Sequence, residues 1–490
     1  MGALLVAIAF IPLVATVAAF RAPLQIARAI TIASGTAVFV LVLILIPAAT
    51  DHSAISAGSL LRVDALSVVF LVPTTFLYAI SAIFSVGYLR PPEGPSGRRY
   101  SQRFYVGMNA FCWSMVMAPL VNGLVLVWVA IEITTVISAL LVAIDDTDGA
   151  SEAAWKYILL ASLGLGIALL ATVIMYAAGT KVFGPAYSFN FQEMLSGAPG
   201  FQKDLVRLAY VLAVLGYGTK MGLVPVHTWL PDAHSEAPSP ISALLSGALL
   251  TTSFYAILRF FQVSVRSLGP SYPRTVLLVF GLASLVLAAF YLVSQRDLKR
   301  LLAYSSVEHM GILAIGMSFG APIAIFGVLL HVIAHGAAKG TAFFGAGSVV
   351  RKFKTKDLAR IRGGTSLLPW TGTMLVLAVL GLSALPPFGI FRSEFLIVSG
   401  GLSDPSDAIA AVLIVFVTLA FFGLSWFTTE TMLTPVPAQV GARVSRGETS
   451  RFIVVAMALG LAGLLVLGVH VPGDLSTLLR HAASQLEVAR

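Results

Sequence analysis

The chain has 490 residues, of which 58% are hydrophobic and only 11% charged, whereas a typical soluble domain has roughly 25% charged residues. This composition excludes a water-soluble globular fold and predicts an all-α polytopic membrane protein. The net charge of +9 is carried by Lys and Arg residues scattered over short connections, which is typical of the positive-inside rule and not of a nucleic-acid-binding surface.

Apolar runs of about twenty residues predict about fourteen transmembrane helices, all in a single membrane domain that covers residues 1–490. They begin near residues 2, 30, 64, 104, 122, 154, 205, 240, 274, 301, 321, 368, 407 and 452. The first run has no basic residue before it, so we expect a transmembrane helix there and not a cleaved signal peptide. The longest polar connections, residues 91–103 and 181–204, have the length of loops. Residues 471–490 predict a short amphipathic surface helix.

The basic connections all fall on one side of a fourteen-helix arrangement. They hold Arg21 and Arg28, Arg90 to Arg103, Arg296 to Arg300, Arg351 to Arg362, and Arg443 to Arg451. That side is expected to be cytoplasmic, because short cytoplasmic loops of membrane proteins carry an excess of Lys and Arg. Both chain ends are then expected in the periplasm, with the protein in a cytoplasmic membrane of the bacterial type.

The only cysteine, Cys112, lies inside an apolar run. One cysteine cannot form an internal disulfide or hold an iron–sulfur cluster by itself. We therefore expect no cofactor in this chain and place any redox centre in partner chains.

Glu132 lies midway along the fifth predicted helix, in WVAIEITT. A lone carboxylate in hydrocarbon is either protonated or paired with a cation, and we favour a cationic partner. The alternative is a neutral side chain that hydrogen-bonds to Thr134 or Ser138 on the same helix.

Lys220 begins the densest motif of the chain, KMGLVPVHTWLPDAHSEAPSPISALLSG, in the seventh predicted helix. A charge at this depth is costly and marks a functional site. Pro225 follows and interrupts the helix, and broken membrane helices are typical of ion pathways. We interpret the nearby His227 and His234 as parts of a surface turn and not as a metal site.

Glu308 and His309 follow the basic connection at residues 296–300. They are candidates for proton uptake from the cytoplasmic side, because both side chains exchange protons and lie soon after that connection. The alternative is that they cap the helix and pair with Lys299 and Arg300.

His331, His335 and Lys339 recur every four residues in LLHVIAHGAAKGTAFF, which places them on one face of a helix. Imidazoles exchange protons near neutral pH, so this face predicts a proton relay. Metal ligation by the two histidines is disfavoured because Lys339 would repel a cation and no further ligand follows at the usual spacing. A purely structural role, in which these polar residues fasten helices together, is compatible with transport.

The twelfth predicted helix repeats the pattern of the seventh. In GLSALPPFGIFRSEF, Pro386 and Pro387 lie shortly before the buried Glu394. In the seventh helix, Pro225 likewise lies close to a buried charge, shortly after Lys220. Paired interruptions of this kind indicate an internal, inverted repeat, with the halves at about residues 104–262 and 274–430. The alternative is two ordinary proline kinks.

These motifs together resemble the antiporter-like, proton-translocating membrane subunits of respiratory complex I, of membrane-bound group 4 NiFe hydrogenases and of Mrp-type sodium/proton antiporters. The resemblance covers nearly the whole chain. It is carried by WVAIEITT, GTKMGLVPVHTWLPDAHSEAPSP, DLKRLLAYSSVEHMG, HVIAHGAAKG and LPPFGIFRSEF. SALLSG and SSVEHMG look most similar to the hydrogenase-4 branch, and within it to subunits like component F. The family fold implies fourteen core helices, two inverted five-helix repeats, and breaks in helices 7 and 12.

The resemblance also implies roles for single residues. A glutamate of the fifth helix pairs with a lysine of the broken seventh helix in this family, and these positions correspond to Glu132 and Lys220. A central lysine, here Lys339, passes protons towards a terminal residue, here Glu394. Complex I subunits usually have a histidine in the eighth helix where this chain has Ser246, so Ser246 with water is the candidate replacement and a further candidate for proton uptake.

We therefore expect a proton-translocating subunit of a multisubunit redox complex, of the hydrogenase-4, formate hydrogenlyase or complex I type. The expected partners are other membrane subunits, lipid, and a peripheral arm with NiFe hydrogenase and iron–sulfur subunits. The alternative is an Mrp-type Na⁺/H⁺ antiporter subunit, although hard cations prefer several oxygen ligands and this line of lysine and histidine favours protons. A quinone-binding redox enzyme has no supporting motif, and a solute transporter would not explain charges spread over several helices.

Overall fold

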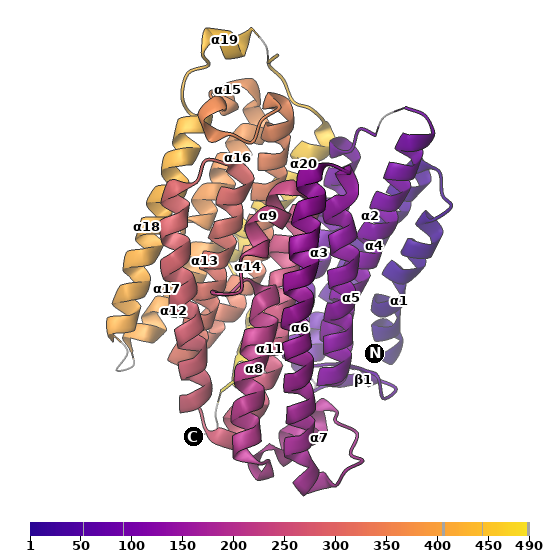
Figure 1. Cartoon of the computed structure of the whole chain (residues 1–490), viewed down its shortest axis with the longest axis vertical. Coiled ribbons are helices and arrows are strands. Elements are labelled where there is room, and N and C mark those ends of the chain that lie inside the picture. The colour runs from indigo at the N-terminus through magenta and orange to yellow at the C-terminus, as the bar shows by residue number, and fades with distance from the viewer. Residues whose placement is uncertain (52, 92, 404–406, 443, 488–490) are drawn as a thin grey trace.

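The computed structural model describes residues 1–51, 53–91, 93–403, 407–442 and 444–487, and long helices make up almost all of it (Figure 1). Arg443, from the predicted basic connection, and residues 488–490, from the predicted tail helix, lie outside the described residues.

The first half of the chain holds eleven α-helices and a small β-hairpin in the described residues. These are α1 (Gly2–Ala19), α2 (Leu24–Asp51), β1 (Ile55–Ala57), β2 (Leu61–Val63), α3 (Ala65–Tyr88), α4 (Pro95–Leu120), α5 (Leu124–Val142), α6 (Asp148–Phe183), α7 (Phe191–Gly197), α8 (Lys203–Met221), α9 (Trp229–Glu236), α10 (Ser239–Leu244) and α11 (Leu250–Leu268). β1 and β2 pair antiparallel, with Ser56 opposite Arg62. A single π-helical turn, η3 (Leu245–Leu249), joins α10 to α11.

The second half holds ten α-helices in its described part. Its helices are α12 (Ser271–Ser294), α13 (Leu298–Phe319), α14 (Pro322–Phe353), α15 (Gly364–Leu367), α16 (Pro369–Leu382), α17 (Gly389–Leu402), α18 (Asp407–Met432), α19 (Ala438–Gly441), α20 (Arg451–Val469) and α21 (Gly473–Ser484).

Ten helical stretches in the described residues are long and apolar enough to cross a membrane. They are α1, α2, α3, α5, α6, α10 with α11, α12, α14, α18 and α20. The other four predicted spans fall on α4, α8, α13 and α16. The helices α4, α8 and α13 carry charged residues in their first turns, and α16 has only 14 residues. The structure thus confirms a mostly helical membrane protein.

Two connections differ from the sequence-based prediction. Residues 91–103 were expected to be a loop, but α4 already begins at Pro95, because proline at the first helical position has the right φ and needs no hydrogen-bond partner for a backbone N–H. Within residues 181–204, α6 continues to Phe183 and the short helix α7 follows. Asn190 caps α7 by accepting a hydrogen bond from the Glu193 N–H over 2.9 Å.

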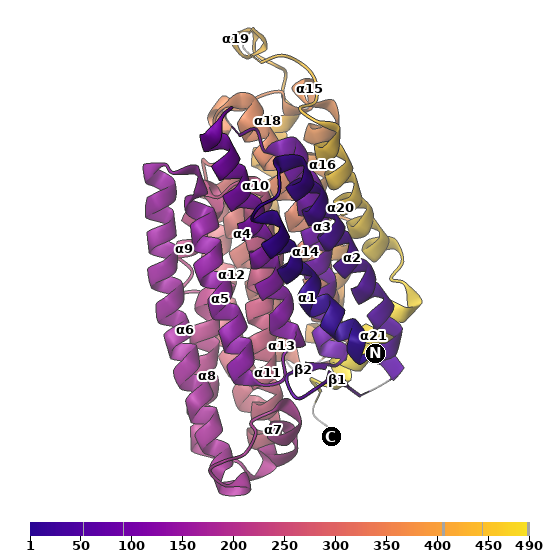
Figure 2. The ribbon, with the colours of Figure 1, turned by 90° about the vertical axis from the view of Figure 1, so that its right-hand side faces the viewer.

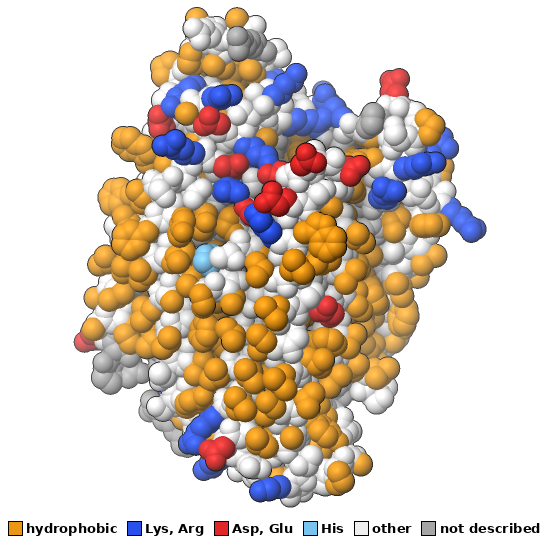
Figure 3. Space-filling view, viewed as in Figure 1, with side chains coloured by type: hydrophobic (Ala, Val, Ile, Leu, Met, Phe, Trp, Pro, Cys, Tyr) orange, Lys and Arg blue, Asp and Glu red, His pale blue; other side chains and the backbone are white. Residues whose placement is uncertain are grey.

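The two ends of the bundle differ in charge. The start of α1, the β-hairpin, α7 and α21 lie at one end, and α15 and α19 lie at the other (Figures 1 and 2). Figure 3 shows an apolar belt around the middle and most of the visible Lys and Arg side chains towards the α15 and α19 end. The connections at that end contain Arg21, Arg90, Arg296, Lys354, Lys356, Arg360 and Arg362. The predicted basic connections therefore share one end in the part of the chain that the structure describes.

The interior of the bundle is formed by α3, α11 and α14, whose residues are almost all buried, whereas α1, α6, α12, α18 and α20 keep an exposed apolar face. An apolar face towards the outside and polar residues inside is the pattern expected of a helix bundle in lipid. The ionisable residues discussed below are on α5, α8, α13, α14 and α17.

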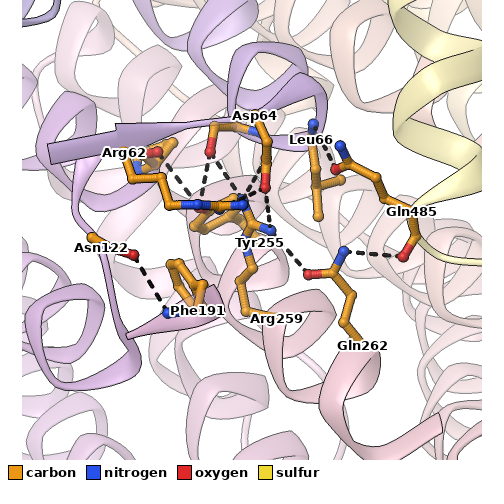
Figure 4. Close-up of polar contacts among 11 residues, drawn as sticks. Arg62, Asp64, Leu66, Asn122, Phe191, Tyr255, Arg259, Gln262 and Gln485 are labelled. Atoms are coloured by element: carbon orange, nitrogen blue, oxygen red, sulfur yellow. Dashed lines mark hydrogen bonds and ion pairs between the residues drawn. The ribbon is translucent and has the colours of Figure 1, made fainter. Parts of the chain in front are cut away.

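A buried ion pair fastens the end of the bundle that carries the hairpin (Figure 4). Arg259 of α11 donates to Asp64 just before α3, with Nη2 2.6 Å from Oδ1. Asp64 Oδ1 also accepts the Ser67 N–H at 3.0 Å and so caps α3. Gln262 of α11 donates to the Gln485 carbonyl at 3.1 Å, which ties the segment after α21 to the same cluster. Burial raises the pKa of Asp64, but the charge and hydrogen bonds of Arg259 outweigh it and hold that pKa well below its usual range.

Candidate functional site

The ionisable residues singled out by the sequence lie almost entirely inside the bundle. Lys220, His309, His331, His335 and Lys339 are fully buried, and the side chains of Glu308 and Glu394 are nearly so. Ionisable residues buried in a membrane protein are candidates for a functional site.

Lys220 is placed by the end of α8. It occupies the last turn, and Gly222, with φ +89°, ends the helix in the left-handed conformation that glycine adopts readily. Residues 222–228 are not helical, and the chain resumes as α9 at Trp229. The Lys220 ammonium donates to Thr135 Oγ1 of α5 at 2.8 Å and to the Tyr157 hydroxyl of α6.

Glu132, the expected partner of Lys220, does not lie within ion-pair distance of it in this structure. It lies on α5 one turn before Thr135, is partly exposed, and forms no ion pair with Lys220 within 4.0 Å among the described residues. One of its carboxylate oxygens is buried with no hydrogen-bond partner among the described residues. Glu132 is still near enough for its charge to act on Lys220, whose ammonium is held by two hydroxyl groups.

Ser246 lies in η3, the π-helical turn between α10 and α11. Its hydroxyl is 2.7 Å from the hydroxyl of Ser306 on α13, and both residues are fully buried. π-turns inside helices are frequent at functional sites. Two hydroxyls in contact can each donate and accept, which suits proton transfer between helices.

Lys339 of α14 is bound to α13. Its ammonium donates to the Leu302 carbonyl at 3.0 Å and to the hydroxyl of Ser305, the neighbour of Ser306. Glu308 lies one turn after Ser305 on α13, and one of its buried oxygens has no hydrogen-bond partner in the described part of the chain. Lys339 and Glu308 thus extend the polar line that Ser246 and Ser306 begin.

A histidine cluster joins α13, α14 and α17 beyond Lys339. His309 Nδ1 is 3.1 Å from His331 Nε2 and 3.8 Å from an oxygen of Glu394. His331 Nδ1 is in turn 2.9 Å from the Ser393 hydroxyl. The ring of His335 lies 5.3 Å from that of His309, centroid to centroid, and neither of its nitrogens has a hydrogen-bond partner among the described residues.

The same cluster contains the residue types that bind transition metals. One ligand atom each from His309, His331 and Glu394 lies within 4.8 Å of the others. The short contact between the two imidazole nitrogens is a hydrogen bond, which accounts for the arrangement without an ion. Lys339, one turn from His335 on α14, brings a positive charge that disfavours a cation nearby.

The position of Glu308 and His309 differs from the expectation that they lie close to the basic connection. They lie about three turns into α13, buried beside the histidine cluster. Arg392, two residues before Glu394, forms no ion pair with it among the described residues, and the cation-forming group that lies near Glu394 is His309. The reason is the helical periodicity of α17, which turns residues two apart to different faces.

Several polar residues of the site were not singled out from the sequence. Thr135, Tyr157, Ser305, Ser306 and Ser393 all contact a predicted site residue. Ser305 and Ser306 lie in the motif AYSSVEHMG and could have been identified there by their spacing from Glu308. Nothing in the sequence around Tyr157 indicates that it lies beside Lys220.

Comparisons with known proteins agree on the kind of protein. Residues 121–423 match the family described as NADH:quinone oxidoreductase/Mrp antiporter, TM. A hydrogenase-4 component F homolog of Methylacidiphilum infernorum (isolate V4) is 38% identical over 369 residues, which are 73% of this chain and 76% of that protein. Hydrogenase-4 component B of Escherichia coli (strain K12) is 29% identical over 347 residues, 68% of this chain, and the match spans only 50% of that protein.

Solved structures share the fold at low sequence identity. A chain of the Mrp complex from Dietzia sp. DQ12-45-1b superposes with a TM-score of 0.85 at 20% identity and covers 99% of this chain and 97% of that one. A chain of respiratory complex I from Thermus thermophilus gives a TM-score of 0.81 at 22% identity, with 99% of this chain and 100% of that one covered. The chain therefore belongs to the family of NADH:quinone oxidoreductase and Mrp antiporter transmembrane subunits.

Proposed function

We propose that this protein is a proton-translocating membrane subunit of a multisubunit redox complex of the hydrogenase-4 type. The observation that carries the proposal is a line of polar residues through the bundle, all of them buried except the partly exposed Glu132. It runs through Glu132, Thr135, Tyr157, Lys220, Ser246, Ser306, Lys339, Glu308, His309, His335, His331 and Glu394. Intramembrane ionisable residues in such a line are typical of proton relays.

The transfer begins at Lys220. Two unit charges about 4 Å apart interact by roughly 4 kcal/mol at an effective dielectric constant of about 20. Moving one proton against about 150 mV requires roughly 3.5 kcal/mol, which is of the same size. Pairing Lys220 with Glu132 would therefore hold a proton, and separating them would release it towards Ser246 and Lys339.

The second half of the line delivers the proton. Lys339 would receive it through the Ser246–Ser306 and Ser305 hydroxyls and pass it to the histidine cluster. Glu394, beside His309, is the terminal acceptor at the edge of the cluster. From Ser246 to Glu394 the groups are in contact, adjacent in sequence or about one helical turn apart, whereas the step from Lys220 to Ser246 would need bridging water.

Fourteen transmembrane helices would complete this architecture. In this arrangement α8 with α9, and α16 with α17, are the two interrupted helices, and residues 222–228 and 383–388 are the interruptions. The proposed inverted repeats cover about residues 104–262 and 274–430 within one membrane domain. The placement of Lys220 at the first interruption and of Glu394 after the second supports this assignment.

The basic end of the bundle would face the cytoplasm, so that both chain ends face the periplasm of a bacterial-type cytoplasmic membrane. The gathering of Lys and Arg at the α15 and α19 end supports this orientation (Figure 3). The proposed partners are further membrane subunits and a peripheral arm with NiFe hydrogenase and iron–sulfur subunits. The similarity to a hydrogenase-4 component F homolog supports that choice. We propose that this chain holds no cofactor.

An Mrp-type Na⁺/H⁺ antiporter subunit is the second candidate, favoured by the fold shared with a chain of the Mrp complex. Na⁺ sites need several oxygen ligands, whereas the centre of this line consists of lysine and histidine nitrogens. The proton is therefore the preferred cargo.

Purification of the native complex in mild detergent, followed by mass spectrometry of its subunits, separates the two candidates. We expect a NiFe hydrogenase large subunit and iron–sulfur subunits to copurify. Proton movement in sealed vesicles should also persist when Na⁺ is replaced by K⁺. A complex that contains only small membrane subunits and moves protons only with Na⁺ present would favour the antiporter.

A further inference from the structure

Lys220 is held by two hydroxyl groups from two helices. Thr135 Oγ1 of α5 accepts from the ammonium at 2.8 Å, and the Tyr157 hydroxyl of α6 accepts from it as well. The ammonium also lies 4.6 Å from the centre of the Tyr157 ring, where a cation is attracted by the aromatic face. Lys220, Thr135 and Tyr157 are all fully buried.

We propose that Thr135 and Tyr157 form an inner binding position for the Lys220 ammonium, and that Tyr157 is a positioning residue that competes with Glu132 for it. This inference rests on the proposed proton-translocating function and adds the state in which Lys220 gives up its proton.

The spacing on α5 makes two positions available. Glu132 and Thr135 are three residues apart and lie one turn from each other on the same helix face, separated by about 4.5 Å along the axis. The flexible four-carbon stem of lysine can bring its amine to either residue. The observed hydrogen bonds place the amine at the inner position, and one Glu132 oxygen has no hydrogen-bond partner among the described residues, as an unoccupied outer position would require.

The two positions differ in how strongly they hold a proton on the Lys220 amine. At Glu132 the carboxylate charge would keep the ammonium protonated. The hydroxyls of Thr135 and Tyr157 carry no charge, and each can accept from an ammonium or donate to a neutral amine. The inner position therefore tolerates lysine before and after it loses a proton, which is what a release step requires.

The surroundings hold Tyr157 in place and connect it to the interruption after α8. Its hydroxyl is 2.7 Å from Ser138 Oγ, and its ring lies 4.5 Å from the ring of Trp229, centroid to centroid. Trp229, the first residue of α9, donates its indole N–H to the carbonyl of Thr219, next to Lys220, at 2.7 Å. A movement of α9 relative to α8 would therefore act on Tyr157 and Lys220 together.

Glycine permits the close approach of α6 and α8 that this arrangement needs. A Cβ atom on Gly164 of α6 would lie 2.5 Å from the Cβ of Thr219, too close for any side chain. Gly164 follows Tyr157 by two turns on the same helix, so the contact sets the distance between the tyrosine and Lys220.

The test is Tyr157→Phe in the assembled complex, since this change removes the hydroxyl and keeps the ring. We expect the initial rate of proton movement in sealed vesicles to fall about ten- to a hundredfold, because the variant loses one hydrogen bond to a charged group. A cryo-EM structure of the variant should show the Lys220 amine within ion-pair distance of Glu132. If Tyr157 served only to pack the helices together, the variant would leave the Lys220 amine in place. Thr135→Val should shift the amine in the same direction and serves if the tyrosine variant assembles poorly.

Tyr210→Phe is the matched control. Tyr210 is also fully buried, but its hydroxyl contacts the Pro273 carbonyl at 3.3 Å and not Lys220, so we expect a normal rate. A normal rate and an unmoved Lys220 in Tyr157→Phe, with proton movement abolished in Lys220→Ala, would overturn the inner position and leave the proposed function intact. Proton movement that survives Lys220→Ala would overturn the proposed function itself.

Discussion

Lys220 donates a hydrogen bond to Thr135 Oγ1 over 2.8 Å, although the carboxylate of Glu132 lies only one turn away on the same helix. A buried cation normally pairs with the nearest carboxylate, because an unpaired charge in the membrane is expensive. The hydroxyl contact therefore identifies a state in which the lysine and the glutamate are separated. Separation of this pair is the step that would release a proton.

Removing the central lysine should interrupt the line. Lys339→Ala takes away the only ammonium that donates to α13 at Leu302 and Ser305 among the described residues. We expect proton movement in sealed vesicles to fall by about a hundredfold or more, since a positioned proton-transfer group typically contributes that much. Lys354→Ala, in the connection after α14, should leave the rate unchanged. A normal rate in Lys339→Ala would place the path elsewhere.

The serine pair should matter for transfer and little for assembly. Ser246→Ala removes one of the two hydroxyls that connect η3 to α13 at 2.7 Å. We expect the rate of proton movement to fall about tenfold, which is the effect of losing one hydrogen bond, because water can fill part of the gap. Ser253→Ala, on the following helix α11, removes a hydroxyl that donates to the Leu249 carbonyl one turn before it at 3.3 Å, and should have no effect. Equal rates in the two variants would contradict the role of the pair.

Glu394 should be needed as a carboxylate. Glu394→Gln keeps the size of the side chain next to His309 and removes its ability to hold a proton. We expect a loss of proton movement of about a hundredfold or more. Glu430→Gln, which affects an ion pair with Arg362 at the basic end, is the comparison variant and should pump normally. Proton movement in Glu394→Gln at the level of Glu430→Gln would exclude Glu394 as the terminal acceptor.

The ion pair between Asp64 and Arg259 should stabilise the fold without affecting transport chemistry. Asp64→Asn leaves the buried Arg259 without its counter-charge, which costs about 3–5 kcal/mol, so we expect a clearly lower melting temperature of the purified protein. Asp204→Asn, which breaks an exposed pair with Arg207, should change the melting temperature very little.

The pH dependence of this contribution follows from the lowered pKa of Asp64. A carboxylate whose pKa is lower in the folded state stabilises the protein above its unfolded pKa of about 3.9 and loses that effect as the pH falls further. The difference in melting temperature between wild type and Asp64→Asn should therefore be constant from pH 8 to pH 5 and shrink only below about pH 4. A difference that shrinks between pH 8 and pH 6 would mean that another group is responsible.

Much of the fold follows from hydrophobic runs. Ten of the fourteen predicted spans fall on helical stretches of the described residues that are long and apolar enough to cross a membrane, because long apolar runs in lipid must satisfy their backbone hydrogen bonds internally. The starts of helices were less predictable. Pro95 begins α4 inside a segment rich in polar residues and glycine, where composition favours a loop and only the position of proline favours a helix.

The charged residues of the site could be predicted from the sequence, whereas its uncharged polar residues could not. Lys220, Lys339 and Glu394 stand out because an ionisable residue inside an apolar run needs a reason. Tyr157 and Thr135 do not stand out, since tyrosine and threonine are common in membrane helices, and only the packing of α5, α6 and α8 brings them to Lys220. The separation of Lys220 from Glu132 is a property of one conformation and could not be read from residue types.

Glu132 and Lys220 are proposed to form the switch of the proton path. Proton movement should be measured in sealed vesicles that contain the assembled complex, with wild type, Glu132→Ala, Lys220→Ala and the control Tyr210→Phe, and with assembly of each variant checked by native gel electrophoresis. We predict that both alanine variants assemble and move no protons, while wild type and Tyr210→Phe do. Proton movement that persists in both alanine variants would contradict the account.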